Sequence, residues 1–189
     1  MTHSNTSAAK LLVANLPLLE ALRIDTGVLD LACGSGRNGG LLVRRGLPVT
    51  FADRDAESLR QVAATAGQER QDGQNGQFGE VRLWQVDLEA PGSEPLRDKC
   101  FDAVLVFNYL HRPLLPALCE VVRPGGLLFY ETFTTAQRAY GRPRNPDFLL
   151  RPGELRETFA DWDILHDFEG ELPDPTRAVA SLIARKPET

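Results

Sequence analysis

Hydrophobic residues along this chain fall into short runs that alternate between two kinds of spacing. Runs that are continuous or have a period of two predict strands, and segments with apolar residues three to four positions apart predict helices. On this basis we predict strands at 28–33, 48–52, 80–86, 101–107, 127–130, 162–168 and 177–185. We predict helices at 38–45, 56–66 and 114–122, and a further helix that starts at 151.

The alternation of strands and helices, with short connections between them, predicts an α/β fold with a doubly wound parallel sheet and right-handed crossovers. The last two strands are joined by a turn that contains Pro173 and Pro175, so they predict a hairpin that places one antiparallel strand near the sheet edge. The Gly- and Gln-rich stretch 67–79 predicts an exposed, mobile loop. We predict a single domain over residues 1–189, which includes a short flexible N-terminal segment at 1–8.

Composition narrows the class of protein. The chain has 189 residues, is 42% hydrophobic and has a net charge of −5, which disfavours large-scale nonspecific binding to nucleic acid. No apolar run approaches the roughly 18–20 residues of a membrane span, and the first residues lack the apolar core of a secretory signal. The three cysteines form no CxxC pair, so we expect reduced thiols in a cytoplasmic protein, with no disulfide scaffold, no metal site and no membrane association.

The most informative segment is 28–39, in which a buried strand runs into a glycine-rich turn and then a helix. Gly34, Gly36 and Gly39 satisfy GxGxxG, which alone is weak evidence for a dinucleotide site. Glycines allow the backbone to approach a ligand closely, and the helix N-terminus offers N–H groups at the edge where such sheets bind ligands. Asp30, however, would oppose a pyrophosphate. An acidic site favours a ligand with cationic groups, such as an amine and a sulfonium, over the nicotinamide dinucleotide of a dehydrogenase.

The run Leu29-Asp-Leu-Ala-Cys-Gly-Ser-Gly36 resembles the first motif of the class I S-adenosylmethionine-dependent methyltransferases. This resemblance implies a Rossmann-like seven-stranded sheet of order 3-2-1-4-5-7-6 with the last strand antiparallel. It also implies S-adenosylmethionine as cofactor and S-adenosylhomocysteine as product. The segments 108–113, 130–133 and 145–156 look most like those of small bacterial methyltransferases grouped with tellurite-resistance proteins.

The resemblance carries roles onto acidic residues that end two further strands. Asp53 matches the acid that binds both ribose hydroxyls, and its alternative role is a helix N-cap, for which Asp55 is the better candidate. Asp87 matches the acid that accepts a hydrogen bond from the adenine amino group, with the backbone amide of Leu88 facing the ring. The alternative for Asp87 is a solvated acid in a turn.

Within the first motif, we expect Asp30 to orient the methionine end of the cofactor and Cys33 to be a small packed hydrophobe. Asn38 either caps the following helix or helps to hold the carboxylate end of the cofactor. The remaining cofactor contacts that we expect, mostly through the backbone, come from Ala32, Gly34, Gly36, Arg54 and Asn108.

The acceptor wall is expected from the ends of the fourth and fifth strands. The catalytic candidates are His111 as a general base, Tyr109, and Glu131 as a site carboxylate. The alternatives are a histidine packed by Pro113 and an ion pair between Glu131 and an arginine. Arg112 could pair with an anionic substrate or form a surface ion pair. Methyltransferases that act on amino groups of bases or of glutamine often carry Asn/Asp-Pro-Pro-Tyr/Phe at this position, whereas Asn108 is followed here by Tyr-Leu, so the resemblance disfavours methylation of exocyclic amines of DNA or of protein.

The segment 134–150 is long for a connection and contains Arg138, Arg142 and Arg144, so it predicts a lid over an anionic substrate or a contact with RNA phosphate. Together these features predict a methyltransferase that acts on an unidentified small acceptor, such as a thiol, a metalloid or an anionic metabolite. The alternatives are an RNA methyltransferase, which is not favoured, and a noncatalytic S-adenosylmethionine-binding protein. We expect a monomer or a homodimer.

Overall fold

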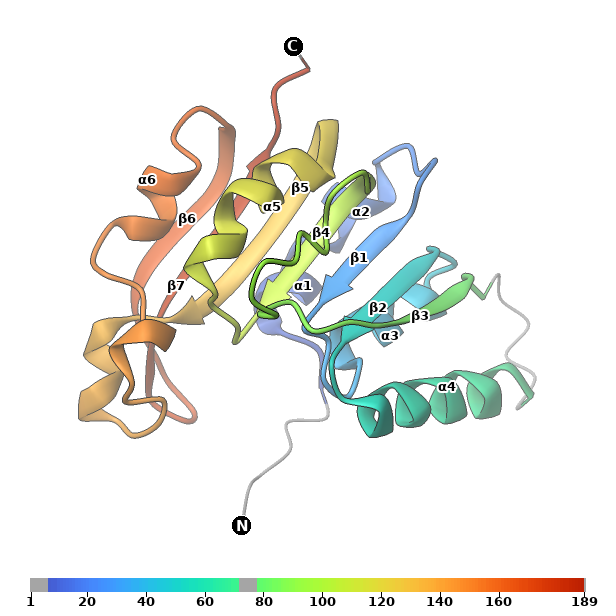
Figure 1. Ribbon diagram of the computed structural model, residues 1–189, viewed down its shortest axis with the longest axis horizontal. Coiled ribbons are helices and arrows are strands. Elements are labelled where there is room, and N and C mark those ends of the chain that lie inside the picture. The colour runs from blue at the N-terminus through green and yellow to red at the C-terminus, as the bar shows by residue number, and fades with distance from the viewer. Residues whose placement is uncertain (1–6, 72–77, 189) are drawn as a thin grey trace. The chain divides into compact units, whose positions relative to one another are not determined.

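The structure, a computed structural model, describes residues 7–71 and 78–188 (Figure 1). The chain folds into two compact units, Met1–Pro95 and Leu96–Thr189. Each unit has its own buried strands and its own candidate site residues, so we describe them one after the other.

The first unit is built on three parallel strands in the order β3-β2-β1. β1 is buried at every position, whereas the edge strand β3 is half buried or exposed throughout. α3 packs against β1 and β2, and α4 against β2 and β3. Its elements are α1 (Lys10–Ala14), α2 (Leu16–Glu20), β1 (Val28–Leu31), α3 (Arg37–Arg44), β2 (Val49–Asp53), α4 (Ala56–Gln71) and β3 (Val81–Gln85).

The cap of α4 explains why the helix begins where it does. The carboxylate of Asp55 accepts hydrogen bonds from the backbone N–H groups of Glu57, at 3.1 Å, and Ser58, at 3.2 Å. Asp55 is therefore the N-cap, as predicted, and Asp53 is not needed for this role. The helix continues through Gly67 to Gln71, five residues beyond its predicted end. The rest of the predicted mobile loop falls largely on 72–77, outside the described residues.

The second unit contains the other four strands. β4 and β5 are parallel, and β7 pairs in the antiparallel sense with both β5 and β6. α5 packs against β5, and α6 against β7. Its elements are β4 (Phe101–Phe107), η1 (Arg112–Leu114), α5 (Leu115–Val121), β5 (Val122–Phe133), η2 (Thr135–Ala139), η3 (Pro146–Phe148), α6 (Glu154–Thr158), β6 (Asp163–Leu172) and β7 (Arg177–Arg185).

The strand order β3-β2-β1-β4-β5-β7-β6 confirms the predicted topology, including the antiparallel β7. β5 begins five residues earlier than predicted. Pro124, Gly125 and Gly126, expected to connect the helix to the strand, are themselves part of the strand, whose pairing with β4 shifts register there. A Cβ on Gly126 would lie 2.6 Å from the carbonyl oxygen of Asp102, so only glycine fits this crossing. Within 7–71 and 78–188, no helix is both long and apolar enough to cross a membrane.

Two helices were not predicted, namely α1 and α2 near the N-terminus, which are five residues long each. They bury Leu12, Leu16 and Leu19. The predicted flexible segment 1–8 falls mainly on residues 1–6, which lie outside the described part of the chain, and α1 starts at Lys10.

Candidate functional site

The turn between β1 and α3 has an alternating backbone. Ala32, Gly34 and Gly36 have φ angles of +53°, +52° and +70°, which lie in the left-handed region. Gly36 is the residue that precedes the first turn of α3. The N–H groups within this turn are used inside the unit: those of Cys33, Gly34 and Gly36 donate to the Ala52 carbonyl oxygen, to Oδ2 of Asp53 and to the Cys33 carbonyl oxygen, at 3.1, 2.8 and 2.9 Å. Ala32 holds this conformation despite its Cβ, at a cost of about 1–2 kcal/mol.

The three glycines of the motif differ in whether the structure has room for a side chain at their position. A Cβ on Gly36 would lie 2.6 Å from Val62, and a Cβ on Gly39 would lie 2.5 Å from the ring of Phe51. These two glycines are therefore required for packing inside the unit. A Cβ on Gly34 would meet no atom within 4 Å. Gly34 is thus the glycine of the motif that faces open space.

Asp30 lies on β1 beneath this turn and is only 2% exposed. Its Oδ2 accepts a hydrogen bond from the backbone N–H of Gly39 at 2.8 Å. Burial raises the pKa of Asp30 from 3.8 to about 7, although the Gly39 N–H and the charge of Arg37 act in the opposite direction. A carboxyl group in this state ionises near neutral pH and favours a cation beside it.

Asp53 ends β2 and connects that strand to the glycine turn. Its Oδ2 accepts the N–H of Gly34 at 2.8 Å, and its Oδ1 accepts the N–H of Asp55 at 2.9 Å. The residue is half buried. Because each carboxylate oxygen has two lone pairs, this arrangement leaves acceptor capacity on the side of Gly34.

Asp87 follows β3, and the segment between them is tied to β2 because the Val86 N–H donates to the carbonyl oxygen of Asp53 at 3.0 Å. The Asp87 side chain is exposed and accepts the N–H of Glu89 at 2.9 Å. This contact matches the alternative role of Asp87, that of a solvated acid in a turn. Leu88 beside it is 7% exposed. Asp30, Asp53 and Asp87 thus belong to three adjacent parallel strands of one unit, toward or just beyond their carboxyl ends.

Two neighbouring predicted residues have other contacts. Asn38 is not the cap of α3, because Gly36 holds that position and Asn38 lies inside the helix. Its Oδ1 accepts the N–H of Ala9 at 2.9 Å, so the buried Asn38 side chain holds the N-terminal segment. Arg54 is exposed, and its carbonyl oxygen accepts a bond of 3.4 Å from the side chain of Gln85.

Cys33 is half buried within the turn. Burial raises the pKa of its thiol, and the negative charges of Asp30 and Asp53 raise it further. A thiol with a raised pKa is a poor nucleophile, in agreement with its interpretation as a packed small residue.

A groove of about 310 Å³ also lies in the first unit, between α3 and α4. Its walls include Val43, Phe51 and Val62, and it is separate from Asp30 and Asp53, neither of which lines it.

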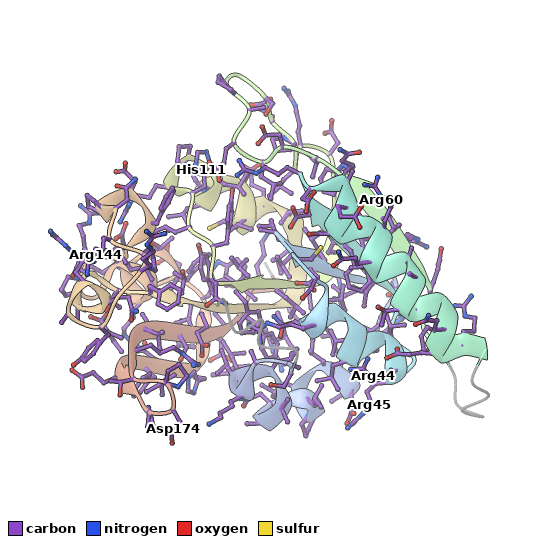
Figure 2. The ribbon with its side chains drawn as sticks, turned by 90° about the horizontal axis from the view of Figure 1, so that it is seen from below. Arg44, Arg45, Arg60, His111, Arg144 and Asp174 are labelled. Atoms are coloured by element: carbon purple, nitrogen blue, oxygen red, sulfur yellow. The ribbon has the colours of Figure 1, made fainter. Side chains whose placement is uncertain are left out.

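In the second unit, the candidate acceptor residues follow β4. Asn108 has a φ angle of +57°, and its N–H donates to the carbonyl oxygen of Glu131 at 2.9 Å. The next residue, Tyr109, is half buried, and its carbonyl oxygen accepts a bond of 3.1 Å from the hydroxyl of Tyr130. His111, labelled in Figure 2, is half buried just before η1, and its carbonyl oxygen accepts the N–H of Leu114 at 2.9 Å.

Glu131 and Arg112 are both engaged in ion pairs. Glu131 is 7% exposed, and its Oε1 lies 3.5 Å from Nη2 of Arg177. Arg112 forms a bidentate pair with Glu154, with Nε–Oε1 and Nη2–Oε2 distances of 2.6 and 2.8 Å. This pair lowers the pKa of Glu154 to about 2. Arg112 also donates to the carbonyl oxygens of Asp147 and Leu149, so its guanidinium holds the chain rather than a substrate.

Sequence reasoning missed Glu154 and also Gln137, a buried amide that accepts the N–H of Ala178 at 2.8 Å. Both contacts join residues about forty positions apart, and no local pattern reveals them.

Comparison with known proteins identifies the family to which these residues and this fold are similar. A family model described as "Methyltransferase domain" matches residues 28–126. The chain is 33% identical over 162 residues to a trans-aconitate 2-methyltransferase of Azoarcus sp. (strain BH72), which covers 83% of this chain and 53% of that protein. It is 28% identical over 168 residues to a ubiquinone biosynthesis O-methyltransferase of Brucella ovis, covering 77% of this chain and 61% of the relative. The chain therefore spans a little over half the length of these relatives.

Solved structures with the same fold include TehB from Haemophilus influenzae, with a TM-score of 0.73 and 23% identity over 97% of this chain and 64% of that one. Magnesium protoporphyrin IX methyltransferase from Synechocystis PCC 6803 with bound SAH has a TM-score of 0.65 and 16% identity, over 93% and 80% of the two chains.

Proposed function

We propose that this chain, which belongs to the methyltransferase domain family, binds S-adenosylmethionine and transfers its methyl group to a small-molecule acceptor. The observation that supports cofactor binding best is the contact between Asp53 and Gly34. It joins a strand-ending carboxylate to the glycine that faces open space. The relatives named for trans-aconitate and ubiquinone biosynthesis support a small acceptor.

The residues of the first unit fit such a cofactor. Asp53 has lone pairs left for two ribose hydroxyls, and the absence of a Cβ at Gly34 leaves room for a ligand beside the turn. Asp30, with its pKa raised by burial, gains stability from a nearby cation such as an ammonium or a sulfonium. We assign the adenine contact to Asp87 and the Leu88 amide, next to the end of β3.

When bound, the cofactor supplies a methyl group on a cationic sulfonium, which is already reactive toward nucleophiles. The contribution of the chain is then to hold the acceptor in line and exclude water, and such positioning is worth on the order of 7–11 kcal/mol in favourable cases. If the acceptor atom carries a proton, we assign its removal to His111, with Tyr109 and Glu131 as the other candidates in the same unit.

The experiment that tests cofactor binding is calorimetry with S-adenosylhomocysteine on the wild type and on Asp53→Ala and Asp53→Asn. We expect the affinity of Asp53→Ala to fall by at least about tenfold, since each hydrogen bond to a charged group is worth about 1.5–3 kcal/mol. Asp53→Asn keeps the shape of the side chain but replaces one acceptor by a donor, so it should also bind more weakly. The control is Asp25→Ala, an exposed aspartate of the same unit that pairs with Arg23.

An unchanged affinity in both Asp53 variants would refute the ribose assignment. If the wild type binds S-adenosylhomocysteine, transfer of a radiolabelled methyl group to pooled small metabolites, and in parallel to total RNA, tests the acceptor class. Binding without transfer to either pool would favour a noncatalytic role.

A further inference from the structure

Segment 134–150, which we call the arginine loop, is closed at its base. Thr134 and Leu150 form a β-bridge, the Thr135 N–H donates to the Leu150 carbonyl at 2.9 Å, and the Leu150 N–H donates to the Phe133 carbonyl at 2.9 Å. Loops with joined ends are compact units that frequently carry function. The two ends of the arginine loop are therefore fixed to the carboxyl end of β5.

The interior of the arginine loop is organised by Gln137, which is 5% exposed. Its Oε1 accepts the N–H of Ala178 on β7, and its Nε2 donates to the carbonyl oxygen of Arg142 at 3.1 Å. Its own carbonyl accepts the N–H groups of Tyr140 and Gly141. The backbone that carries the arginines is thus held in place before any ligand binds, which lowers the entropic cost of binding.

The arginine loop is also attached to the segment that contains the acceptor candidates. Arg112 donates to the carbonyl oxygens of Asp147 and Leu149 at 3.1 and 2.8 Å, while its pair with Glu154 fixes the guanidinium. Arg112 directly follows His111 in the chain. The loop is therefore connected by hydrogen bonds from the Arg112 side chain to the residues after β4, to which we assign the acceptor wall.

The charge of the arginine loop is unusual for this chain. Arg138, Arg142 and Arg144 are all exposed, and the loop has one acidic residue, Asp147, in a protein of net charge −5. Among the described residues, no acidic side chain pairs with any of these three arginines. Arg144 lies on the outer part of the loop in Figure 2.

Several surface arginines elsewhere in the described chain form ion pairs. Arg44, Arg45 and Arg60, also labelled in Figure 2, pair with Glu69, Glu20 and Glu57 at 2.9, 2.8 and 2.6 Å. The arginine loop, in contrast, gathers three exposed arginines within seven positions of the chain, none of which pairs with an acidic side chain of the described residues.

We propose that the arginine loop binds the carboxylate groups of the methyl acceptor, which is a small polycarboxylate. This inference rests on the proposed function. The planar guanidinium matches a carboxylate with two parallel hydrogen bonds, and three such groups suit two or three negative charges. A small anion is favoured over RNA because a long polyphosphate would also meet the negative charge of the remaining chain. The exposed ring of Phe148 offers an apolar contact to the carbon skeleton.

The test is calorimetry in low salt with trans-aconitate, citrate and succinate as probes, in the presence of saturating S-adenosylhomocysteine. It compares the wild type with R138Q/R142Q/R144Q and with the control R44Q/R45Q/R60Q, which removes the same total charge from surface ion pairs of the other unit. We expect the loop variant to bind the best probe at least about tenfold more weakly, and the control to stay within about twofold of the wild type. The single variant R144Q replaces the triple variant if the latter does not fold.

Three results would overturn the inference: no probe binds the wild type, both triple variants lose equal affinity, or the loop variant binds as well as the wild type. A single-stranded RNA that binds the wild type more tightly than any probe, and loses affinity in the loop variant alone, would overturn it in favour of nucleic acid. Binding of S-adenosylhomocysteine separates the two proposals. Its absence in the wild type refutes the proposed function, whereas its presence with any of these results refutes only the polycarboxylate assignment.

Discussion

Replacing Asp30 by asparagine should stabilise the free protein above neutral pH. Asp30 is 2% exposed, and burial raises its pKa from 3.8 to about 7. Between these values the folded chain binds a proton that the unfolded chain releases, so stability falls as pH rises and the loss is complete above about pH 7. Asparagine carries no charge and keeps an oxygen that can accept the Gly39 N–H, which lies 2.8 Å from Oδ2.

The size of the effect follows from the same pKa. The difference between 3.8 and about 7 corresponds to roughly 4 kcal/mol, since one pKa unit is worth about 1.4 kcal/mol. Asp30→Asn and the wild type should therefore differ little near pH 4, where Asp30 is protonated in the folded chain, and most near pH 8. Urea denaturation of both proteins at pH 4, 5, 6, 7 and 8 measures the difference between their free energies of unfolding. Because all other titrating groups are the same in the two proteins, the pH dependence of this difference reports on Asp30.

If Asp30 serves the methionine end of the cofactor, the same substitution should weaken binding of S-adenosylhomocysteine while it strengthens the fold. Opposite changes in stability and affinity mark a residue kept for function at the expense of stability. A difference in unfolding free energy that is independent of pH, or Asp30→Asn being the less stable protein at pH 8, would refute the reasoning.

Two further substitutions test other parts of the structure. Glu154→Gln should lower the free energy of unfolding by about 2–3 kcal/mol at neutral pH, because it leaves the half-buried Arg112 without its charge partner. In the wild type, the stability that Glu154 adds should be lost as pH falls from 4.5 toward about 2. Urea denaturation of both proteins from pH 7 to pH 3 measures both effects. A loss that is the same at pH 3 and pH 7 would contradict this. Gly34→Ala should cost about 1 kcal/mol of stability because of its φ of +52°, yet it should abolish most binding of S-adenosylhomocysteine. Gly39→Ala should cost more stability, about 2–3 kcal/mol, because its Cβ would lie 2.5 Å from the ring of Phe51. Thermal unfolding and calorimetry distinguish the two, and equal stability losses would count against the separate roles.

The strands could be predicted because their signal is local. Both bounds of β4 (Phe101–Phe107) and of β7 (Arg177–Arg185) follow from runs of apolar residues that are buried on both faces of a sheet. α1 and α2 gave no such signal, since a helix of five residues contains too few turns for a period of 3.6 to be recognised. Their stability comes from burying leucines against the rest of the unit, which the sequence of the helix itself does not show.

Side-chain partners far apart in the chain were the part of the candidate site that the sequence could not provide. Arg112 and Glu154 are separated by 42 positions, and Ala9 and Asn38 by 29. The sequence around an arginine that follows a strand is the same whether the arginine binds a substrate or a buried glutamate. Only the fold decides which acid lies within 3 Å, and here it removes Arg112 from the set of residues free to bind a ligand.

The glycine motif illustrates why a spacing pattern can identify a fold element without identifying its ligand. Gly36 and Gly39 are required by Val62 and Phe51, that is, by close packing of α3 and α4 on the sheet, and any strand-turn-helix unit packed so closely would need them. Only Gly34 faces the space where a ligand would lie, and a single glycine carries little information about that ligand. The information lies instead in the acids around it, because Asp30 and Asp53 set the local charge. The preference for a cationic group over a pyrophosphate therefore depends on the buried carboxyl of Asp30, because an acid at the end of the second strand, such as Asp53, suits the ribose of a dinucleotide as well.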